Sequence, residues 1–176
     1  MSDEKLEKYV KSIQDFPVKG VLFRDVTGIL DSGEGFRLAM IEMEMALSGV
    51  PVDKIAAPES RGFIFGAALA DRLRCAFVPI RKPGKLPRET ICEEYELEYG
   101  KAAVEMHTDA IRPGQKVVVV DDLIATGGTV AAICRLVERL GGEVAKICFV
   151  MELAGLKGRE ALKPYEVESL IIYEGK

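Results

Sequence analysis

The chain has 176 residues, 48% of them hydrophobic, which is enough to bury one core, so we expect a single domain over residues 1–176. Its formal net charge of −4 at pH 7 argues against a general binder of nucleic acid or anionic membranes. A membrane span of roughly 18 apolar residues, a secretion signal and Cys-x-x-Cys spacing are all missing, so we expect a cytoplasmic protein with neither a zinc site nor a disulfide framework.

Patterns of apolar residues predict helices and strands that alternate along the chain. In order, the predicted elements are a helix from residue 6 with apolar positions up to Ile13, an irregular stretch over 15–31, a helix over 35–47, a strand over 54–57, a helix over 62–73, a strand over 76–80, a hairpin of strands over 95–100 and 102–107, a strand over 116–120, a helix that opens at 126–129, and strands over 144–151 and 169–173. The hairpin should lie outside the main sheet. This rhythm predicts an α/β fold with a mostly parallel twisted sheet and helices on both faces.

A basic segment follows the predicted strand at 76–80. Residues 81–88 include four Lys or Arg side chains and no acid, and they are too rich in proline and glycine to form a helix. We therefore expect an exposed loop. Taken alone, such a loop is most simply a solvated surface feature.

The strand at 116–120 leads into the most informative motif. Val117–Val120 are four β-branched residues in a row, which suits a parallel strand covered on both faces. Asp121 and Asp122 then fall where open α/β sheets bind their ligands. Thr126–Thr129 open an amphipathic helix, whose free N–H groups and positive end suit a phosphate. The two aspartates must instead face hydroxyls or a metal, so the motif predicts a site for a sugar phosphate.

Other interpretations of this motif fit less well. An ordinary strand–turn–helix junction needs only one capping Asp or Thr, not two Asp and a loop of this composition. The chain also lacks the Gly-x-x-x-x-Gly-Lys-Ser/Thr loop, and Gly33-Glu34-Gly35 lacks the third glycine of a dinucleotide fingerprint. Beside a phosphosugar motif in an acidic chain, the basic segment is better explained as a binding site for diphosphate.

Residues 117–129 resemble the signature of type I phosphoribosyltransferases, in which a hydrophobic strand, two acids and a short Thr/Gly loop hold 5-phosphoribosyl 1-diphosphate. The resemblance implies an α/β domain of that family, with Mg²⁺ carried by the phosphosugar and no direct protein ligand for the metal. It further implies that the phosphoribosyl group is bound by Asp121, Asp122, Ala125, Thr126, Gly127, Gly128 and Thr129.

Four other segments resemble the branch of this family that acts on adenine, and they occur in the same order along the chain: 16–25, 59–66, 80–87 and 97–100. That resemblance implies a small hood over about 1–31 and a mobile loop over about 81–100. The implied site residues are Leu22, Phe23 and Arg24 for adenine, Arg61, Arg81, Lys82 and Lys85 for diphosphate, and Glu98 as the catalytic residue that exchanges a proton with the purine.

The activity implied by the resemblance is purine salvage, in which adenine and 5-phosphoribosyl 1-diphosphate give AMP and diphosphate in a homodimeric enzyme. Ala125 supports a 6-aminopurine. In the similar phosphoribosyltransferases for hypoxanthine and guanine, an aspartate at the corresponding loop position interacts with purine N7, whereas the methyl group of Ala125 cannot exchange a proton. The alternatives are a phosphoribosyltransferase for xanthine or a 6-oxopurine, and a non-enzymatic regulator that senses the phosphosugar with the same fold.

The chain departs from the pattern of this family at three places. Lys19 stands where a proline is usual, Thr27-Gly28 where Ser/Thr-Pro is common, and Arg88 where the loop usually has glycine. We expect Arg88 to stiffen the basic loop and to add charge to it. None of the three removes a proposed catalytic group.

Overall fold

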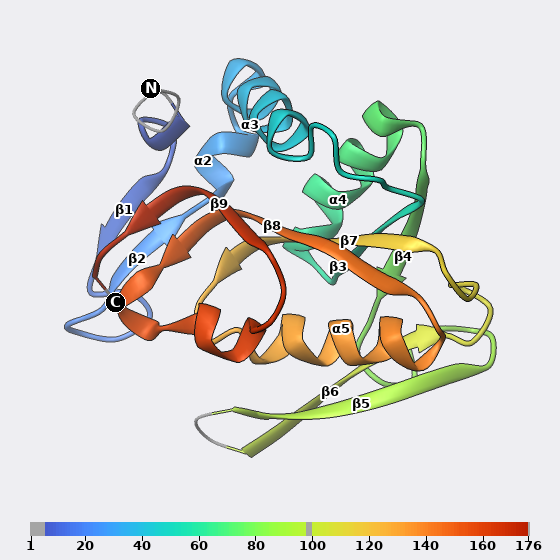
Figure 1. Ribbon diagram of the computed structural model, residues 1–176. Helices are drawn as coiled ribbons and strands as arrows, with labels where there is room; N and C mark the ends of the chain where they lie inside the picture. Colours follow the sequence, from blue (N-terminus) through green and yellow to red (C-terminus); the bar gives the residue numbers. More distant parts are fainter. Residues whose placement is uncertain (1–5, 98–99, 176) are drawn as a thin grey trace.

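The computed structural model describes residues 6–97 and 100–175, and its centre is a five-stranded parallel sheet (Figure 1). The strand order is β4-β3-β7-β8-β9. These strands are β3 (Lys54–Pro58), β4 (Ala76–Ile80), β7 (Lys116–Ile124), β8 (Glu143–Leu153) and β9 (Val167–Tyr173). The predicted α/β fold with a parallel sheet is confirmed.

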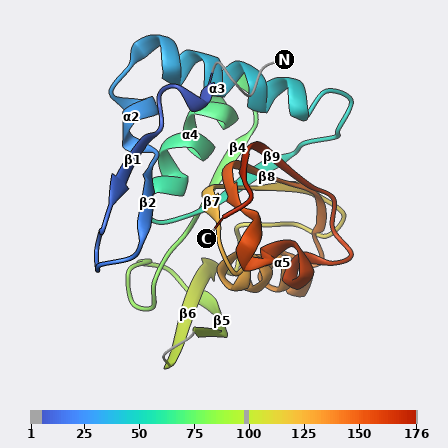
Figure 2. The same ribbon diagram turned by 90° about the vertical axis from the view of Figure 1, so that its left-hand side faces the viewer.

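Helices cover both faces of this sheet (Figures 1 and 2). The helices α3 (Gly33–Ala46) and α4 (Arg61–Leu73) pack on one face, and α5 (Gly128–Arg139) packs on the other. Along β7 the valines alternate between the two cores, with Val118 and Val120 in the first and Val117 and Val119 in the second. All four valines are fully buried, which confirms a strand covered on both faces.

The N-terminal region differs from the prediction. Of the helix predicted from residue 6, only Leu6 and Glu7 are helical, and the chain then turns and continues as β1 (Lys11–Gln14), which pairs antiparallel with β2 (Leu22–Asp25). The stretch predicted to be irregular also contains a short helix, α2 (Thr27–Leu30). Ile13, which a continued helix would bury, is 40% exposed.

Contacts with distant glycines explain why the predicted first helix stops. A Cβ added at Gly28 would lie 2.2 Å from the backbone oxygen of Tyr9, and one added at Gly35 would lie 2.8 Å from the Tyr9 ring. Tyr9 therefore packs closely against α2 and α3, and this tertiary packing outweighs the local helical periodicity.

The predicted hairpin outside the main sheet is confirmed. It consists of β5 (Thr90–Leu97) and β6 (Gly100–His107), so its first strand begins earlier than the predicted residue 95. An isolated antiparallel bridge between Arg81 and Glu105 joins β6 to the basic segment. In the part of the chain that the structure describes, no helix has the length and apolarity to cross a membrane.

Candidate active site

The two adjacent aspartates lie within β7, because the strand continues to Ile124 and not only to the predicted residue 120. Asp122 is 4% exposed and accepts a short hydrogen bond from the Arg61 Nε. The Asp121 Oδ1 accepts a hydrogen bond of 2.8 Å from the backbone N–H of Asp122. The pair thus sits at the carboxyl end of the central strand, with one member fixed by a cation.

The two aspartates also differ in their electrostatic surroundings. Burial raises the pKa of Asp121 well above its ordinary value, and the negative charge of Asp122 raises it further. Burial opposes the charge on Arg61, but the hydrogen bond and the charge of Asp122 outweigh it and raise the pKa of the guanidinium. Asp121 is therefore the carboxyl group that gains most from hydroxyl donors on a ligand, such as the diol of a ribose.

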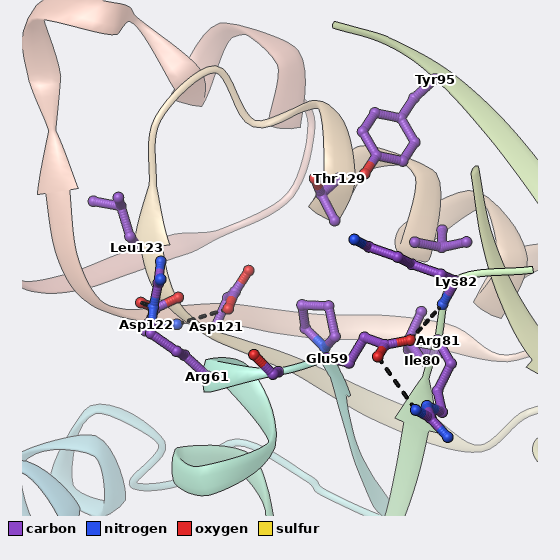
Figure 3. Close-up of a pocket in the computed structure, with 13 residues that line it drawn as sticks. Glu59, Arg61, Ile80, Arg81, Lys82, Tyr95, Asp121, Asp122, Leu123 and Thr129 are labelled. Carbon is purple, nitrogen blue, oxygen red and sulfur yellow. Dashed lines mark hydrogen bonds and ion pairs between the residues drawn. The ribbon is translucent and has the colours of Figure 1, made fainter. Parts of the chain in front are cut away.

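A central cavity of about 310 Å³ opens beside the aspartates (Figure 3). The carboxyl ends of β3, β4 and β7 meet around it, as expected for the ligand site of a parallel sheet. Its lining residues are Pro58, Glu59, Ser60, Arg61, Ile80, Arg81, Lys82, Tyr95, Val104, Asp121, Asp122, Leu123 and Thr129. Three of the residues predicted to bind diphosphate are thereby brought to one cavity with the acidic pair.

Three basic residues, Arg61, Arg81 and Lys82, form the basic wall of this cavity. Glu59, which the sequence interpretation missed, holds two of them in place. Its carboxylate accepts hydrogen bonds from the backbone N–H of Lys82 at 2.7 Å and from the Arg81 Nη2 at 3.3 Å. The bond from Lys82 is the main reason that the pKa of Glu59 is lowered, and Arg81 lowers it further against the effect of burial. Figure 3 shows the Lys82 side chain extending into the cavity while its backbone is held by Glu59.

The rest of the basic segment points elsewhere. Among the described residues, Lys85 does not line the central cavity, and its backbone oxygen accepts a hydrogen bond of 3.3 Å from the Arg81 Nη1. Arg88 donates to Asp109 at 2.8 Å and contacts the His107 Nδ1 at 3.1 Å. The charge that Arg88 was expected to add to the loop is therefore directed toward Asp109 and away from the central cavity.

The predicted phosphate loop borders a smaller cavity of about 100 Å³. This cavity is lined by Asp121, Leu123, Ile124, Ala125, Thr126, Gly127, Gly128, Thr129, Val130 and Phe149, and it shares Asp121, Leu123 and Thr129 with the central cavity. The helix α5 begins at Gly128, so its first N–H groups lie at the loop that lines this cavity. A phosphate bound there would meet the positive end of the helix.

The close packing of this loop depends on Gly127. Its φ of +79° lies in the left-handed region, and an added Cβ would lie 2.5 Å from the backbone oxygen of Gly158. Gly128 has no such restriction, since its added Cβ would meet the Tyr95 ring at an ordinary contact of 3.4 Å. The steric requirement for glycine in this loop is therefore strongest at Gly127.

A third cavity, of about 370 Å³, lies beneath the β1–β2 hairpin. Its lining residues are Ile13, Phe16, Phe23, Arg24, Asp25, Val26, Thr27 and Arg61, and Arg61 also lines the central cavity. Phe16 and Phe23 meet edge to face with ring centroids 5.1 Å apart. A largely apolar cavity bordered by an exposed Phe16 ring and a half-buried Phe23 ring suits a flat heterocycle next to the ribose site.

The predicted base-binding residues are not all brought to this cavity. Phe23 and Arg24 line it, whereas Leu22 is not among the described residues that do so. The Arg24 guanidinium lies 4.1 Å from the centroid of the Tyr173 ring and donates a hydrogen bond to Ser12. Arg24 thus also attaches the hairpin to β9, a role that the sequence did not indicate.

Tyr95 on β5 is a further residue of the central cavity, whereas the position of the predicted catalytic residue is not described. Glu98, the predicted catalytic residue, lies outside the described residues. Tyr95 was not predicted, yet its ring lines the central cavity, and Figure 3 shows its hydroxyl end directed into it on the side of Thr129. An isolated tyrosine in an alternating strand carries no signal that would have identified it from the sequence.

Comparisons with known proteins agree with this geometry. Residues 42–174 match the family model described as phosphoribosyl transferase domain. The chain is 62% identical over 173 residues to a protein of Butyrivibrio fibrisolvens named adenine phosphoribosyltransferase, covering 98% of this chain and 96% of the relative. A relative of the same name from Lachnoclostridium phytofermentans is 57% identical over 173 residues, covering 98% of this chain and 99% of the relative.

Solved structures of proteins with this name are also similar to the chain. The crystal structure of adenine phosphoribosyltransferase from Thermoanaerobacter pseudethanolicus matches with a TM-score of 0.94 and 51% identity, covering 97% of this chain and 99% of that one. The enzyme from Saccharomyces cerevisiae, complexed with an imino-altritol bisphosphate and adenine, matches with a TM-score of 0.89 and 40% identity, covering 96% of this chain and 98% of that one.

Proposed function

This chain belongs to the adenine phosphoribosyltransferase branch of the phosphoribosyltransferase family, and from that membership we infer that it is a purine-salvage enzyme. It joins adenine to 5-phosphoribosyl 1-diphosphate and forms AMP and diphosphate. The observation that carries this function is a series of adjoining cavities that suit, in order, a base, a ribose with its diphosphate, and a phosphate.

The residues of the central cavity and of the phosphate loop have separate roles in the reaction. The reacting ribose carbon develops the charge of an oxocarbenium ion, with diphosphate leaving one face and purine N9 arriving at the other. Asp121 and Asp122 hold the ribose hydroxyls, and the loop of Ala125, Thr126, Gly127, Gly128 and Thr129 fixes the 5′-phosphate. The protein itself needs no nucleophile.

The leaving diphosphate is stabilised by the basic wall. Arg61, Arg81 and Lys82 line the cavity and bind the diphosphate directly, while Lys85 contributes its charge from outside the cavity wall. Mg²⁺ would enter on the phosphate oxygens of the phosphosugar, with no direct protein ligand, and the acidic pair Asp121 and Asp122 lies beside the cavity that would receive it. When bound with the phosphosugar, Mg²⁺ offsets the negative charge that develops on the diphosphate.

Adenine occupies the cavity beneath the β1–β2 hairpin. The described part of the proposed hood, residues 6–31, covers the base, with Phe23 and Arg24 in the cavity wall. Leu22 contributes through its backbone. Glu98 exchanges a proton with the purine as the glycosidic bond forms, in a site from which water is excluded. Ala125 supports adenine over the oxopurines, since its methyl group cannot exchange a proton at purine N7.

We propose a cytoplasmic homodimer in which the basic segment reaches toward the site of the neighbouring subunit. The two earlier alternatives, a phosphoribosyltransferase for other purines and a non-enzymatic regulator, are not supported by relatives that are 51–62% identical and named adenine phosphoribosyltransferase.

A substrate panel tests the function directly. The purified protein is mixed with 5-phosphoribosyl 1-diphosphate, Mg²⁺ and one of adenine, hypoxanthine, guanine or xanthine, and nucleotide formation is measured. We expect adenine to exceed each oxopurine in kcat/KM by a ratio of about 10⁴, since a site built for the amino group leaves buried polar groups unpaired against an oxo group. An oxopurine that matched adenine would refute the base assignment, and the absence of any nucleotide would refute the enzyme.

A further inference from the structure

The strand β5 presents one face to α5, and the two elements lie along each other (Figure 1). Along this strand Ile91, Glu93 and Tyr95 are half-buried, whereas Cys92, Glu94 and Glu96 are exposed. Successive side chains of a strand point to opposite sides, so the half-buried set forms the face toward α5. Its middle member is a carboxylate between two apolar side chains.

Both oxygens of this carboxylate are bound by α5. The Arg135 Nε lies 2.6 Å from the Glu93 Oε1, and the Arg139 Nη1 lies 3.0 Å from the Glu93 Oε2. Arg139 also donates to the backbone oxygen of Cys92 at 2.7 Å. Glu93 is 22% exposed in its side chain, so this clasp of Glu93, Arg135 and Arg139 is less screened than an ordinary surface pair.

The clasp lies two residues before Tyr95, whose ring reaches the other end of α5. An ideal Cβ at Gly128 would be 3.4 Å from the Tyr95 Cδ2 and 3.5 Å from the backbone oxygen of Glu96. The hairpin therefore contacts the first residue of α5, where the phosphate loop ends, and Tyr95 lines the central cavity there. A fixed position of β5 along α5 is what keeps this ring at the phosphate loop.

We propose that Glu93 is a positioning residue, which binds Arg135 and Arg139 and so fixes β5 on α5. In this position the Tyr95 ring forms the part of the site wall that lies beside the phosphate of the bound phosphosugar or AMP. This role rests on the proposed function, because the ring is useful there only if a phosphorylated ligand binds at the start of α5. Tyr95 excludes water from the bound phosphate and strengthens its interaction with the helix N–H groups.

A double-mutant cycle tests the coupling between Glu93 and Tyr95. The dissociation constant for AMP is measured by calorimetry for the wild type, Glu93→Gln, Tyr95→Ala and the double variant. Glu94→Gln is the matched control, because Glu94 lies on the opposite face of β5 and pairs with Lys101 at 3.6 Å, both side chains being 70% exposed. Tyr95→Leu keeps the apolar bulk and replaces Tyr95→Ala if the latter does not fold.

The expected changes are specific to this mechanism. Glu93→Gln weakens AMP binding about threefold and Tyr95→Ala about tenfold, in keeping with a partly buried ion pair and a lost aromatic contact. The double variant loses about tenfold and not the roughly thirtyfold of independent effects, because Glu93 acts through Tyr95. Glu94→Gln changes the constant by less than about twofold.

Other outcomes overturn the proposal. An unchanged constant in Glu93→Gln, a fully additive double variant, or an equal loss in Glu94→Gln would each remove the positioning role. Amide hydrogen exchange over residues 90–97 of the ligand-free protein examines the clasp separately, and Glu93→Gln should exchange faster there than Glu94→Gln. If the wild type does not bind AMP, the proposed function fails and Tyr95 loses its role, although faster exchange would still show the clasp itself.

Discussion

At the scale of single residues, the adjacent aspartates Asp121 and Asp122 have different electrostatic surroundings. Asp122 is stabilised by the Arg61 hydrogen bond, whereas burial and the charge of Asp122 raise the pKa of Asp121. A raised pKa means that the folded protein binds the Asp121 proton more tightly than the unfolded chain does. Stability contributed by this group is therefore lost as the pH rises from the ordinary aspartate value of 3.8 through the raised value.

We expect Asp121→Asn to unfold at a higher temperature than the wild type at neutral pH, because it cannot carry the unfavourable charge. The advantage should shrink as the pH is lowered toward the ordinary aspartate value. Thermal unfolding of the ligand-free proteins at several pH values measures this difference. Asp122→Asn is the control, since it loses the partner of Arg61, and it should gain nothing at neutral pH; equal gains would mean that the two carboxyl groups share the unfavourable charge.

Gly127→Ala should weaken AMP binding by about tenfold or more, because the left-handed conformation costs a residue with a Cβ about 1–2 kcal/mol and the methyl group also meets Gly158. Equilibrium binding of AMP and of ribose 5-phosphate reports the change. Gly128→Ala is the matched comparison, and its effect should be smaller because the added carbon only touches Tyr95. The loop geometry would be wrong if Gly128→Ala were the more damaging change.

Glu98→Gln should lower kcat by about 10²-fold with a smaller change in KM, since the amide keeps the shape of the side chain but cannot exchange a proton. Steady-state kinetics with adenine, together with a burst experiment that identifies the slow step, measures the effect. Glu94→Gln, four residues earlier in the sequence, should retain normal turnover. Near-normal turnover of Glu98→Gln with chemistry limiting would leave Glu98 without a catalytic role.

At the scale of elements, the carboxyl end of β4 separates two lysines that look alike in the sequence. Lys82 lines the central cavity with its backbone held by Glu59, whereas Lys85 lies outside the cavity wall. We therefore expect Lys82→Ala to weaken inhibition by diphosphate about tenfold and Lys85→Ala about twofold. Inhibition constants measured at low and high salt separate direct contact from long-range charge, and equal losses would show that the segment rearranges around the ligand.

How far each element could be predicted depended on whether its signal was local. The valine run of β7 and the Thr/Gly loop before α5 are contiguous, so the existence of the strand and the start of the helix were predicted correctly, although the strand continues past the predicted residue 120 to Ile124. The helix from Leu6 was predicted to extend too far because its end is set by contacts between Tyr9 and the distant Gly28 and Gly35.

The missed site residues show the same limit. Glu59 and Tyr95 reach the central cavity only through the meeting of separate elements. A single glutamate after a short strand, or a tyrosine in an alternating one, has no distinctive pattern around it. Their roles depend on hydrogen bonds and contacts to Lys82, Arg81 and Gly128 that sequence spacing does not reveal.

At the scale of the whole molecule, the β1–β2 hairpin is attached to the main sheet through Arg24, which lies over the Tyr173 ring of β9. Tyr173→Leu removes this contact, worth on the order of 0.5–1 kcal/mol, while it keeps an apolar side chain at the position. We expect the KM for adenine to rise about threefold, with little change in the KM for the phosphosugar. Steady-state kinetics in both substrates measures the split, and an equal rise in both constants would contradict a role confined to the hood.

The family match covers the sugar-binding residues but not the β1–β2 hairpin. The match begins at residue 42, after β1, β2 and α2, whereas the acidic pair, the phosphate loop and the basic wall all lie within it. Under the proposed assignment, the machinery that activates the sugar is common inheritance, and the choice of base resides largely in an appended N-terminal segment. Such a scaffold can change its substrate in evolution by remodelling that segment, while the sugar chemistry stays under separate selection.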